Sequence, residues 1–189
     1  MTSTNHANRR HDARARVIVG AAFLSLCVAW MSVLPLFAGP DEPANFIKSA
    51  AVVRGEIVGS PIDASATTSF WSTYVNIDSR FGTAQQVPWC FVGQPQVPAC
   101  DKPLSTLTAV EESRTDMGRY PALGFLPAGL GTLVGPSDIG ARAARLTAAL
   151  VCCALLAAAA ELLRRRGRSI APLLVAVSPG VLFLSSVSS

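Results

Sequence analysis

The hydrophobic residues of the chain gather in three long blocks, at residues 17–38, 141–163 and 170–187, whereas a soluble domain would disperse them at helix or strand periods. The first block holds 22 residues without a charge, which at about 1.5 Å per residue crosses a hydrocarbon core of about 30 Å. The second carries charges only near its ends, where long side chains reach the membrane surface. The third is uncharged, and its Pro179-Gly180 pair predicts a kink. We therefore expect an all-α integral membrane protein with three transmembrane helices.

A fourth apolar piece, at residues 120–135, is too short and too interrupted by Pro127 and four glycines to span a membrane. Arginines cluster at residues 1–16, a polar tail that we expect to be disordered, and again in the turn at 164–169. The positive-inside rule places both segments in the cytoplasm, so an even number of crossings separates them. The fourth piece should therefore remain on the outer side or lie in the interface.

The first block has an alternative interpretation as a cleaved signal peptide. Its apolar stretch is longer than the usual signal-peptide core of about 7–15 residues. Cleavage after Ala38 would also place Leu36 where a small residue is preferred. We favour an uncleaved anchor, which makes residues 39–140 a long extracytoplasmic loop.

The start of this loop predicts a short helix at residues 43–54. Asp41 or Glu42 can cap it, Pro43 suits its first turn, and Gly55 suits the position after its end. One side of the predicted helix is apolar, so we expect it to lie along the membrane surface as an interfacial helix. The apolar side chains are Phe46, Ile47, Ala50, Ala51 and Val53.

The rest of the loop is rich in turns and prolines, with strand-like pieces at residues 72–77 and 89–92. Its two cysteines, Cys90 and Cys100, would form a disulfide outside the cytoplasm and staple a segment that has little core. The other three cysteines lie inside apolar blocks, where they are typical packing residues. No spacing of His and Cys predicts a zinc site.

Composition adds a charge argument. The net charge of +4 is unevenly distributed along the chain. Residues 39–140 carry six basic and ten acidic side chains, and the arginine clusters lie outside this range. A nucleic-acid surface would need its basic groups together with base-reading partners. We therefore expect membrane lipid, and no nucleic acid, as a partner.

The candidate chemistry is the proline-framed pair Asp41-Glu42 just outside the first span. A carboxylate can act as a general base when it lies within hydrogen-bond reach of an attacking hydroxyl. A helix N-terminus stabilises such an anion. The structural alternative is that Asp41 caps the helix and Glu42 is a first-turn acid.

The order of these features resembles the GT-C superfamily of multi-pass glycosyltransferases. The resemblance rests on Asp41-Glu42, Tyr120-Pro121, Ala144-Arg145-Leu146, the arginine turn and Ser178-Pro179-Gly180. Within the superfamily, the stretch at residues 40–46 is most similar to the domain-of-unknown-function family numbered 2142. The chain departs from that branch at Asn45, where a histidine is frequent. The resemblance covers residues 17–189 and corresponds to the first part of such an enzyme, so we expect a truncated multi-pass protein whose fragment is inactive alone.

This resemblance implies a polyprenyl-phosphate-linked sugar donor, a cell-envelope glycan acceptor and transfer at the outer face of the cell membrane. Asp41 would be the catalytic base, and Glu42 a second base or, with Asp41, a ligand of a divalent cation. Lys48, Arg54 and Arg119 beside Tyr120 would bind the donor phosphate. Lipid head groups and interface anchoring are the alternative roles for these side chains.

Two other functions remain open at this stage. A non-enzymatic assembly or export component would use the outer loop, with its segment between Cys90 and Cys100, to bind a partner. A transporter element is favoured less, because no charged residue lies in the middle of a predicted span.

Overall fold

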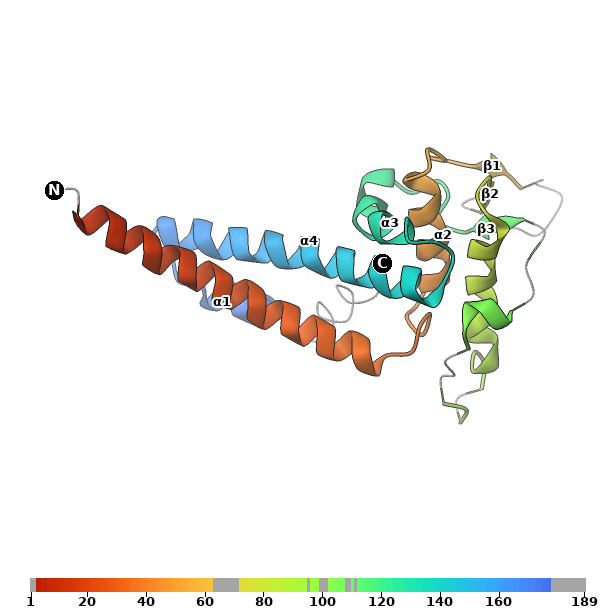
Figure 1. Ribbon diagram of the computed structural model, residues 1–189, viewed down its shortest axis with the longest axis horizontal. Helices are drawn as coiled ribbons and strands as arrows, with labels where there is room; N and C mark the ends of the chain where they lie inside the picture. The colour runs from red at the N-terminus through yellow and green to blue at the C-terminus, as the bar shows by residue number, and fades with distance from the viewer. Residues whose placement is uncertain are drawn as a thin grey trace.

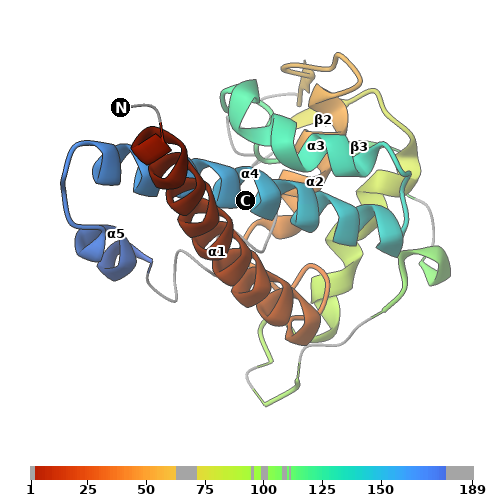
Figure 2. The same ribbon diagram turned by 60° about the vertical axis from the view of Figure 1, so that its left-hand side comes forward.

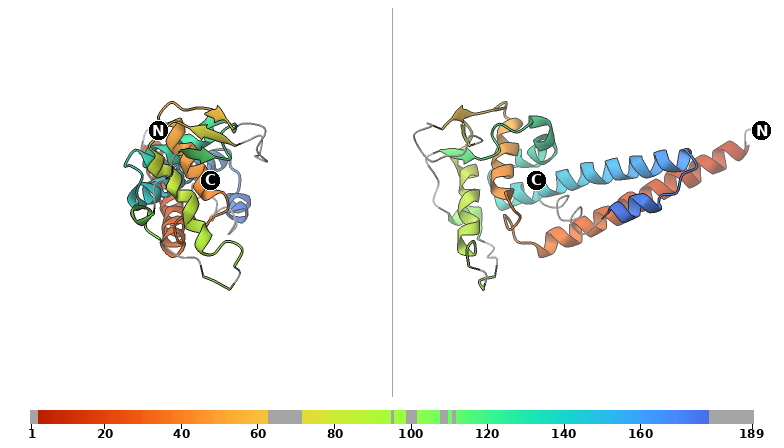
Figure 3. Two further views of the ribbon diagram at one scale, coloured as in Figure 1. Left: turned by 90° about the vertical axis from the view of Figure 1, so that its right-hand side faces the viewer. Right: turned by 180° about the vertical axis from the view of Figure 1, so that it is seen from behind.

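The computed structural model describes residues 3–62, 72–94, 96–98, 102–107, 110 and 112–177. Two long helices, α1 (Ser3–Val33) and α4 (Asp138–Arg165), form a hairpin, and the residues between them fold at one end of it (Figures 1 and 3). We call residues 34–137 the interhelix domain. The two long helices pack through a small apolar cluster that includes Phe23, Cys27 and Cys153.

Helix α1 differs from the prediction at both ends. It begins at Ser3, so the tail that was expected to be disordered continues the helix. The residues of this tail include several Ala and Arg, which are strong helix formers, and no Gly or Pro. The helix ends at Val33 instead of Ala38, because a residue that precedes a proline, here Leu34 before Pro35, disfavours helical backbone.

Helix α4 confirms the second predicted apolar helix. It is the one helix among the described residues that is long and apolar enough to cross a membrane. The apolar part of α1, Val17–Val33, is shorter than this, and α5 (Ala171–Ala176) is a short helix. The remainder of the third predicted span, residues 178–189, lies outside the described residues. Three spans are therefore not confirmed.

The interhelix domain is built around α2 (Glu42–Val52). A three-stranded antiparallel sheet with the order β1-β2-β3 was missed by the prediction of an all-helical fold, although β2 falls within the strand-like piece at 72–77. The other strand-like piece, 89–92, begins at the end of a 3-10 helix. The strands are β1 (Ser60–Pro61), β2 (Thr73–Val75) and β3 (Ser113–Thr115), and the 3-10 helices are η1 (Ser79–Cys90), η2 (Leu104–Thr106) and η3 (Ala122–Phe125).

The predicted interfacial helix is instead the central helix of this domain. Every residue of α2 except Pro43 is buried, so no face is left for the membrane surface. The Phe46 ring packs between those of Phe37, in an edge-on contact, and Phe81, in a tilted one, with ring centroids 5.3 and 5.5 Å apart. The apolar side that suggested a surface helix thus faces protein, and the polar residues of α2 are enclosed by other elements as well.

Helix α3 (Leu126–Thr132) lies beside α2 and the start of α4 (Figure 2). Two of its glycines allow this close approach. A Cβ on Gly129 would lie 2.7 Å from the carbonyl oxygen of Ser49, and one on Gly131 would lie 2.3 Å from the backbone of Ala143 and Ala144. The apolar piece at 120–135 therefore forms η3 and α3, both too short to cross a membrane, as the sequence predicts.

Candidate functional site

A buried ion pair joins the first residue of α2 to α4. The Arg145 side chain donates from Nε to Oε1 of Glu42 at 2.6 Å and from Nη2 to Oε2 at 2.9 Å. The two side chains are 1% and 2% exposed. Arg145 also donates to the backbone oxygens of Leu34 and Pro35, at 2.9 and 2.7 Å. One guanidinium therefore joins the end of α1, the start of α2 and α4.

The same carboxylate shapes the connection between α1 and α2. Oε2 of Glu42 accepts a hydrogen bond from the Gly39 backbone N–H at 3.2 Å. Among the described residues, only Phe37 and Asp41 are non-glycine residues with positive φ, at 61° and 56°. Such backbone is unfavourable for a side chain with the bulk of Phe and uncommon for Asp. The ion pair and the buried Phe37 ring hold this connection in place.

Asp41 has different surroundings from its neighbour Glu42. It occupies the N-cap position of α2, but its side chain makes no capping hydrogen bond and is exposed. Its backbone oxygen accepts from the Asn45 N–H at 2.9 Å, so the backbone begins the helix while the carboxylate is left for other partners. The predicted cap position is correct, but the expected capping bond is not formed.

Asp41 lines a cavity of about 600 Å³ between the α1–α2 connection, η1 and β3. The two residues with positive φ both belong to its lining. The cavity combines apolar and aromatic walls with a few charged and amide groups, which is typical of sites for small polar molecules. Besides the α1–α2 connection, the lining includes Gln85, Trp89, Arg114 and Asp116.

The wall opposite the connection carries its own polar network. Gln85 of η1 donates to the backbone oxygen of Arg114 at 2.7 Å, which ties η1 to β3. Nη2 of Arg114 lies 3.3 Å from Oδ1 of Asp116 and 3.2 Å from the hydroxyl of Ser72, and that hydroxyl donates to Asp116. Trp89, at the end of η1, is 73% exposed at the edge of the cavity.

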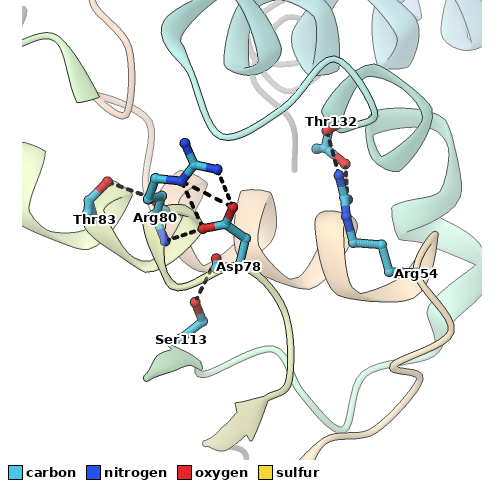
Figure 4. Close-up of polar contacts among 6 residues, drawn as sticks. All are labelled: Arg54, Asp78, Arg80, Thr83, Ser113 and Thr132. Atoms are coloured by element: carbon cyan, nitrogen blue, oxygen red, sulfur yellow. Dashed lines mark hydrogen bonds and ion pairs between the residues drawn. The ribbon is translucent and has the colours of Figure 1, made fainter. Parts of the chain in front are cut away.

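The start of η1 is fixed by an acid that lies outside this cavity. Asp78 is the N-cap residue, and its carboxylate accepts from the Arg80 backbone N–H at 3.0 Å (Figure 4). The Arg80 guanidinium hydrogen-bonds the same carboxylate and lowers its pKa below the ordinary value. Ser113 of β3 donates to the Asp78 backbone oxygen at 3.4 Å, so η1 and β3 are joined here too.

The geometry does not support the predicted cation site at Asp41 and Glu42. Both Glu42 oxygens accept from Arg145, whereas Asp41 lines the cavity. In the described part of the chain, no group of three or more His, Cys, Asp or Glu side chains is placed to hold a metal ion. The two neighbouring carboxylates therefore have different surroundings in this arrangement.

Two of the predicted phosphate ligands are enclosed by the fold. Lys48 is fully buried, and its ammonium donates to the backbone oxygens of Ile57 and of Gly118, the latter at 2.5 Å. Burial lowers the pKa of this ammonium from its ordinary value of 10.5. Phe125 lies 5.9 Å from the nitrogen, at the usual limit of a cation–π contact.

Arg54 has an equivalent structural role. It donates to the hydroxyl and the backbone oxygen of Thr132 in α3, at 3.1 and 3.0 Å (Figure 4), and to the Ala50 oxygen. Its guanidinium lies 4.6 Å from the centroid of the Phe81 ring. Arg119 and Tyr120 are exposed just before η3. None of the four predicted substrate-binding residues, Tyr120 included, lines the cavity of Asp41.

Only one half of the predicted disulfide lies within the described residues. Cys90 is disulfide-bonded, and its expected partner, Cys100, lies outside the described residues. Cys27, Cys152 and Cys153 are free thiols, two of them buried between α1 and α4.

Comparison with known proteins adds one finding to this geometry. The family model described as "Predicted membrane protein (DUF2142)" matches residues 24–189. The chain belongs to the DUF2142 family. No curated protein and no solved structure matches it. The match covers α1 from Leu24 onward, the whole interhelix domain and α4, so the cavity lies within the region that the family model matches.

In this DUF2142 member, sequence reasoning missed the wall of the cavity opposite Asp41. No sequence motif marks Gln85, Arg114 or Asp116 as site residues. They meet Asp41 only through long-range packing of η1 and β3 on α2, for which the sequence has no local signal. Arg145 did carry a signal, because a charge near the end of an apolar helix is expected to have a partner.

Proposed function

We propose that this DUF2142 protein is the N-terminal part of a membrane glycosyltransferase that uses a polyprenyl-phosphate-linked sugar donor. The observation that carries the proposal is the position of Asp41. It is an exposed carboxylate in uncommon backbone geometry, at the wall of a cavity of about 600 Å³. Backbone held in sparsely populated regions clusters at functional sites, where the surrounding structure keeps it in place.

Asp41 is the proposed catalytic base. It accepts the proton of an acceptor hydroxyl while that oxygen attacks the anomeric carbon of the donor sugar. The bond between the anomeric carbon and the phosphate oxygen breaks, and polyprenyl phosphate leaves with the electron pair. The proton then passes from Asp41 to water.

Glu42 is proposed as a positioning residue instead of a second base. Its carboxylate is buried, is engaged by Arg145 and the Gly39 N–H, and does not line the cavity, so an acceptor in the cavity does not reach it in this arrangement. By holding the connection between α1 and α2, the pair fixes the direction in which Asp41 faces. Of the Asp-Glu pair that resembles GT-C enzymes, Asp41 would thus perform the chemistry and Glu42 would hold it in position.

The acceptor is proposed to be a cell-envelope glycan. Trp89 offers an exposed aromatic face at the edge of the cavity, and Arg114 and Asp116 offer a donor and an acceptor for sugar hydroxyls. Aromatic faces combined with a few convergent polar groups suit a polar ring. For the donor phosphate, Arg119 beside Tyr120 stays the candidate, since Lys48 and Arg54 are used inside the fold.

The proposed orientation follows from charge. The arginines of residues 1–16 and 164–168 lie at the end of the α1–α4 hairpin away from the interhelix domain (Figure 1). The positive-inside rule then places the interhelix domain, with Asp41, on the extracytoplasmic side. This orientation puts the cavity on the side where cell-envelope glycans are assembled.

Membranes that contain the full-length gene product provide the test. Transfer of sugar from a panel of radiolabelled polyprenyl-phosphate hexoses and pentoses to cell-envelope glycan is compared for wild type, Asp41→Asn and Glu112→Gln. Asp41→Asn should lower the rate by about 100-fold or more, the scale of a lost general base. Glu112→Gln, an exposed acid outside the cavity lining, should not. Normal transfer by Asp41→Asn at equal membrane content refutes the assignment of the base. Absence of transfer by wild type on every donor favours the non-enzymatic assembly or export component.

A further inference from the structure

We propose that the outward face of η3 and α3 inserts into the acyl-chain region of the membrane leaflet next to the interhelix domain. This leucine face consists of Leu123, Leu126 and Leu130 together with Leu133 and Val134, which directly follow α3. The proposal concerns a lipid-binding surface of the chain and holds whether or not the protein is an enzyme.

The exposure pattern of this segment is opposite to that of a soluble surface helix. All five members of the leucine face are exposed, and Leu130 and Leu133 are 57% and 58% exposed. The small residues Ala128, Gly129 and Gly131 are buried against the protein. The segment thus presents its large apolar side chains outward, and no charged residue occurs between Arg119 and Asp138. Exposed apolar patches of this kind mark protein or membrane contacts.

The packing of α3 fixes its height relative to the membrane. Gly131 meets α4 at Ala143 and Ala144, because a Cβ there would lie 2.3 Å from their backbone. The apolar part of α4 begins only two residues later, at Leu146, and continues to Leu163 with Glu161 as its only charge. At about 1.5 Å per residue, α3 lies within roughly one helical turn of the start of the hydrocarbon core.

Continuity with α4 identifies lipid as the occupant of the leucine face. Leu146 and Leu150, in the first turns of the apolar part of α4, are exposed as well. Large apolar side chains are therefore exposed both on α3 and on the part of α4 next to it, a helix that is long enough to span the membrane. Arg119 and Tyr120, at the start of the segment, are of the types that anchor at lipid head groups.

This insertion would also hold the candidate site near the membrane surface. Helix α2 lies crosswise to the long α1–α4 hairpin, and α3 packs on it through Gly129 (Figures 1 and 2). Because α2 carries Asp41 at its N-terminus, seating α3 in the leaflet holds Asp41 close to the membrane surface. The membrane contact that the sequence predicts for the helix at 43–54 is thus made by η3 and α3.

Site-directed nitroxide labelling of the full chain in vesicles of phosphatidylcholine and phosphatidylglycerol tests this insertion. Labels are placed by Leu130→Cys and Leu133→Cys, with Val58→Cys as the matched control. Val58 is an apolar residue of similar exposure, 52%, just before β1. Strand β1 lies further from α4 along the hairpin axis than α3 does (Figure 1). The chain without introduced cysteines, treated alike, measures the background from native thiols.

The proposal predicts that collisions with oxygen, relative to those with a water-soluble nickel chelate, are several times more frequent at Leu130 and Leu133 than at Val58. Oxygen concentrates in acyl chains and the chelate stays in water. Equal accessibility to the chelate at all three positions overturns the proposal. An immobilised label that both reagents fail to reach also overturns it, because a protein segment, from this chain or a second copy, would then cover the leucine face.

Discussion

The buried pair of Glu42 and Arg145 allows the sharpest prediction from the fold. Replacing either partner leaves an ionised group without its counter-charge in a place that water does not reach. Breaking a buried pair from one side costs about 3–5 kcal/mol of folding free energy. Glu42→Gln keeps the shape of the side chain and removes only the charge, so we expect a loss near the lower value.

Arg145→Met should be more damaging than Glu42→Gln. Besides the pair, it removes the donors to the backbone oxygens of Leu34 and Pro35. A buried group left without its partner costs about 1–3 kcal/mol. We therefore expect a loss toward the upper end of the range. In the double variant no unpaired charge remains, so its loss should be smaller than the sum of the single losses by about 2–3 kcal/mol.

The free energy of unfolding can be measured by titrating SDS into mixed micelles while following helix content by circular dichroism. Arg142→Met is the matched control, since Arg142 is an exposed arginine one turn earlier on α4. Arg80→Met is a second control for an ion pair at the surface, where such pairs contribute little. If Glu42→Gln destabilises the chain no more than Arg142→Met, or if the double variant shows simple additivity, the pair does not hold the connection between α1 and α2.

Two further variants test the packing of the interhelix domain. Burial lowers the pKa of Lys48, so the folded state binds fewer protons than the unfolded state between the folded pKa and the ordinary value of 10.5. Unfolding free energy should therefore rise with pH through that window; this rise should disappear in Lys48→Met and persist in Lys102→Met, a control at an exposed lysine. Gly131→Ala should destabilise the chain by about 1–3 kcal/mol or more, because its Cβ meets the backbone of α4. Gly124→Ala, with nothing within 4 Å, should not, and equal losses in the two alanine variants would contradict the close packing of α3 on α4.

The sequence predicts those features that depend on local pattern. The apolar block at 141–163 appears as α4, and the residues around Pro43 and Gly55 predict α2 to within two residues at each end. The non-spanning nature of 120–135 follows from its length and its glycines. These signals succeed because helix propensity, capping and hydrophobic length act within a few residues of each other.

Tertiary partners decide what the sequence could not predict. The apolar side of the helix at 43–54 indicated a surface helix, but its polar residues Lys48 and Asn45 are buried as well, because other elements surround them. The different surroundings of the Asp41 and Glu42 side chains depend on Arg145, which is 103 residues away from Glu42 in the chain. The opposite wall of the cavity, with Arg114 and Asp116, is likewise assembled by packing between distant segments. Neighbouring carboxylates with the same local signal thus have different surroundings.

The central claim is that Asp41 performs chemistry while Glu42 supports it. Its most direct test is the rate of sugar transfer per folded molecule for Asp41→Asn and Glu42→Gln, with folded protein counted by resistance to SDS. We predict that Asp41→Asn folds normally and loses about 100-fold or more in rate. Glu42→Gln should yield less folded protein, but each folded molecule should keep most of the wild-type rate. The reverse result, normal transfer by Asp41→Asn and loss of transfer by well-folded Glu42→Gln, would contradict the claim.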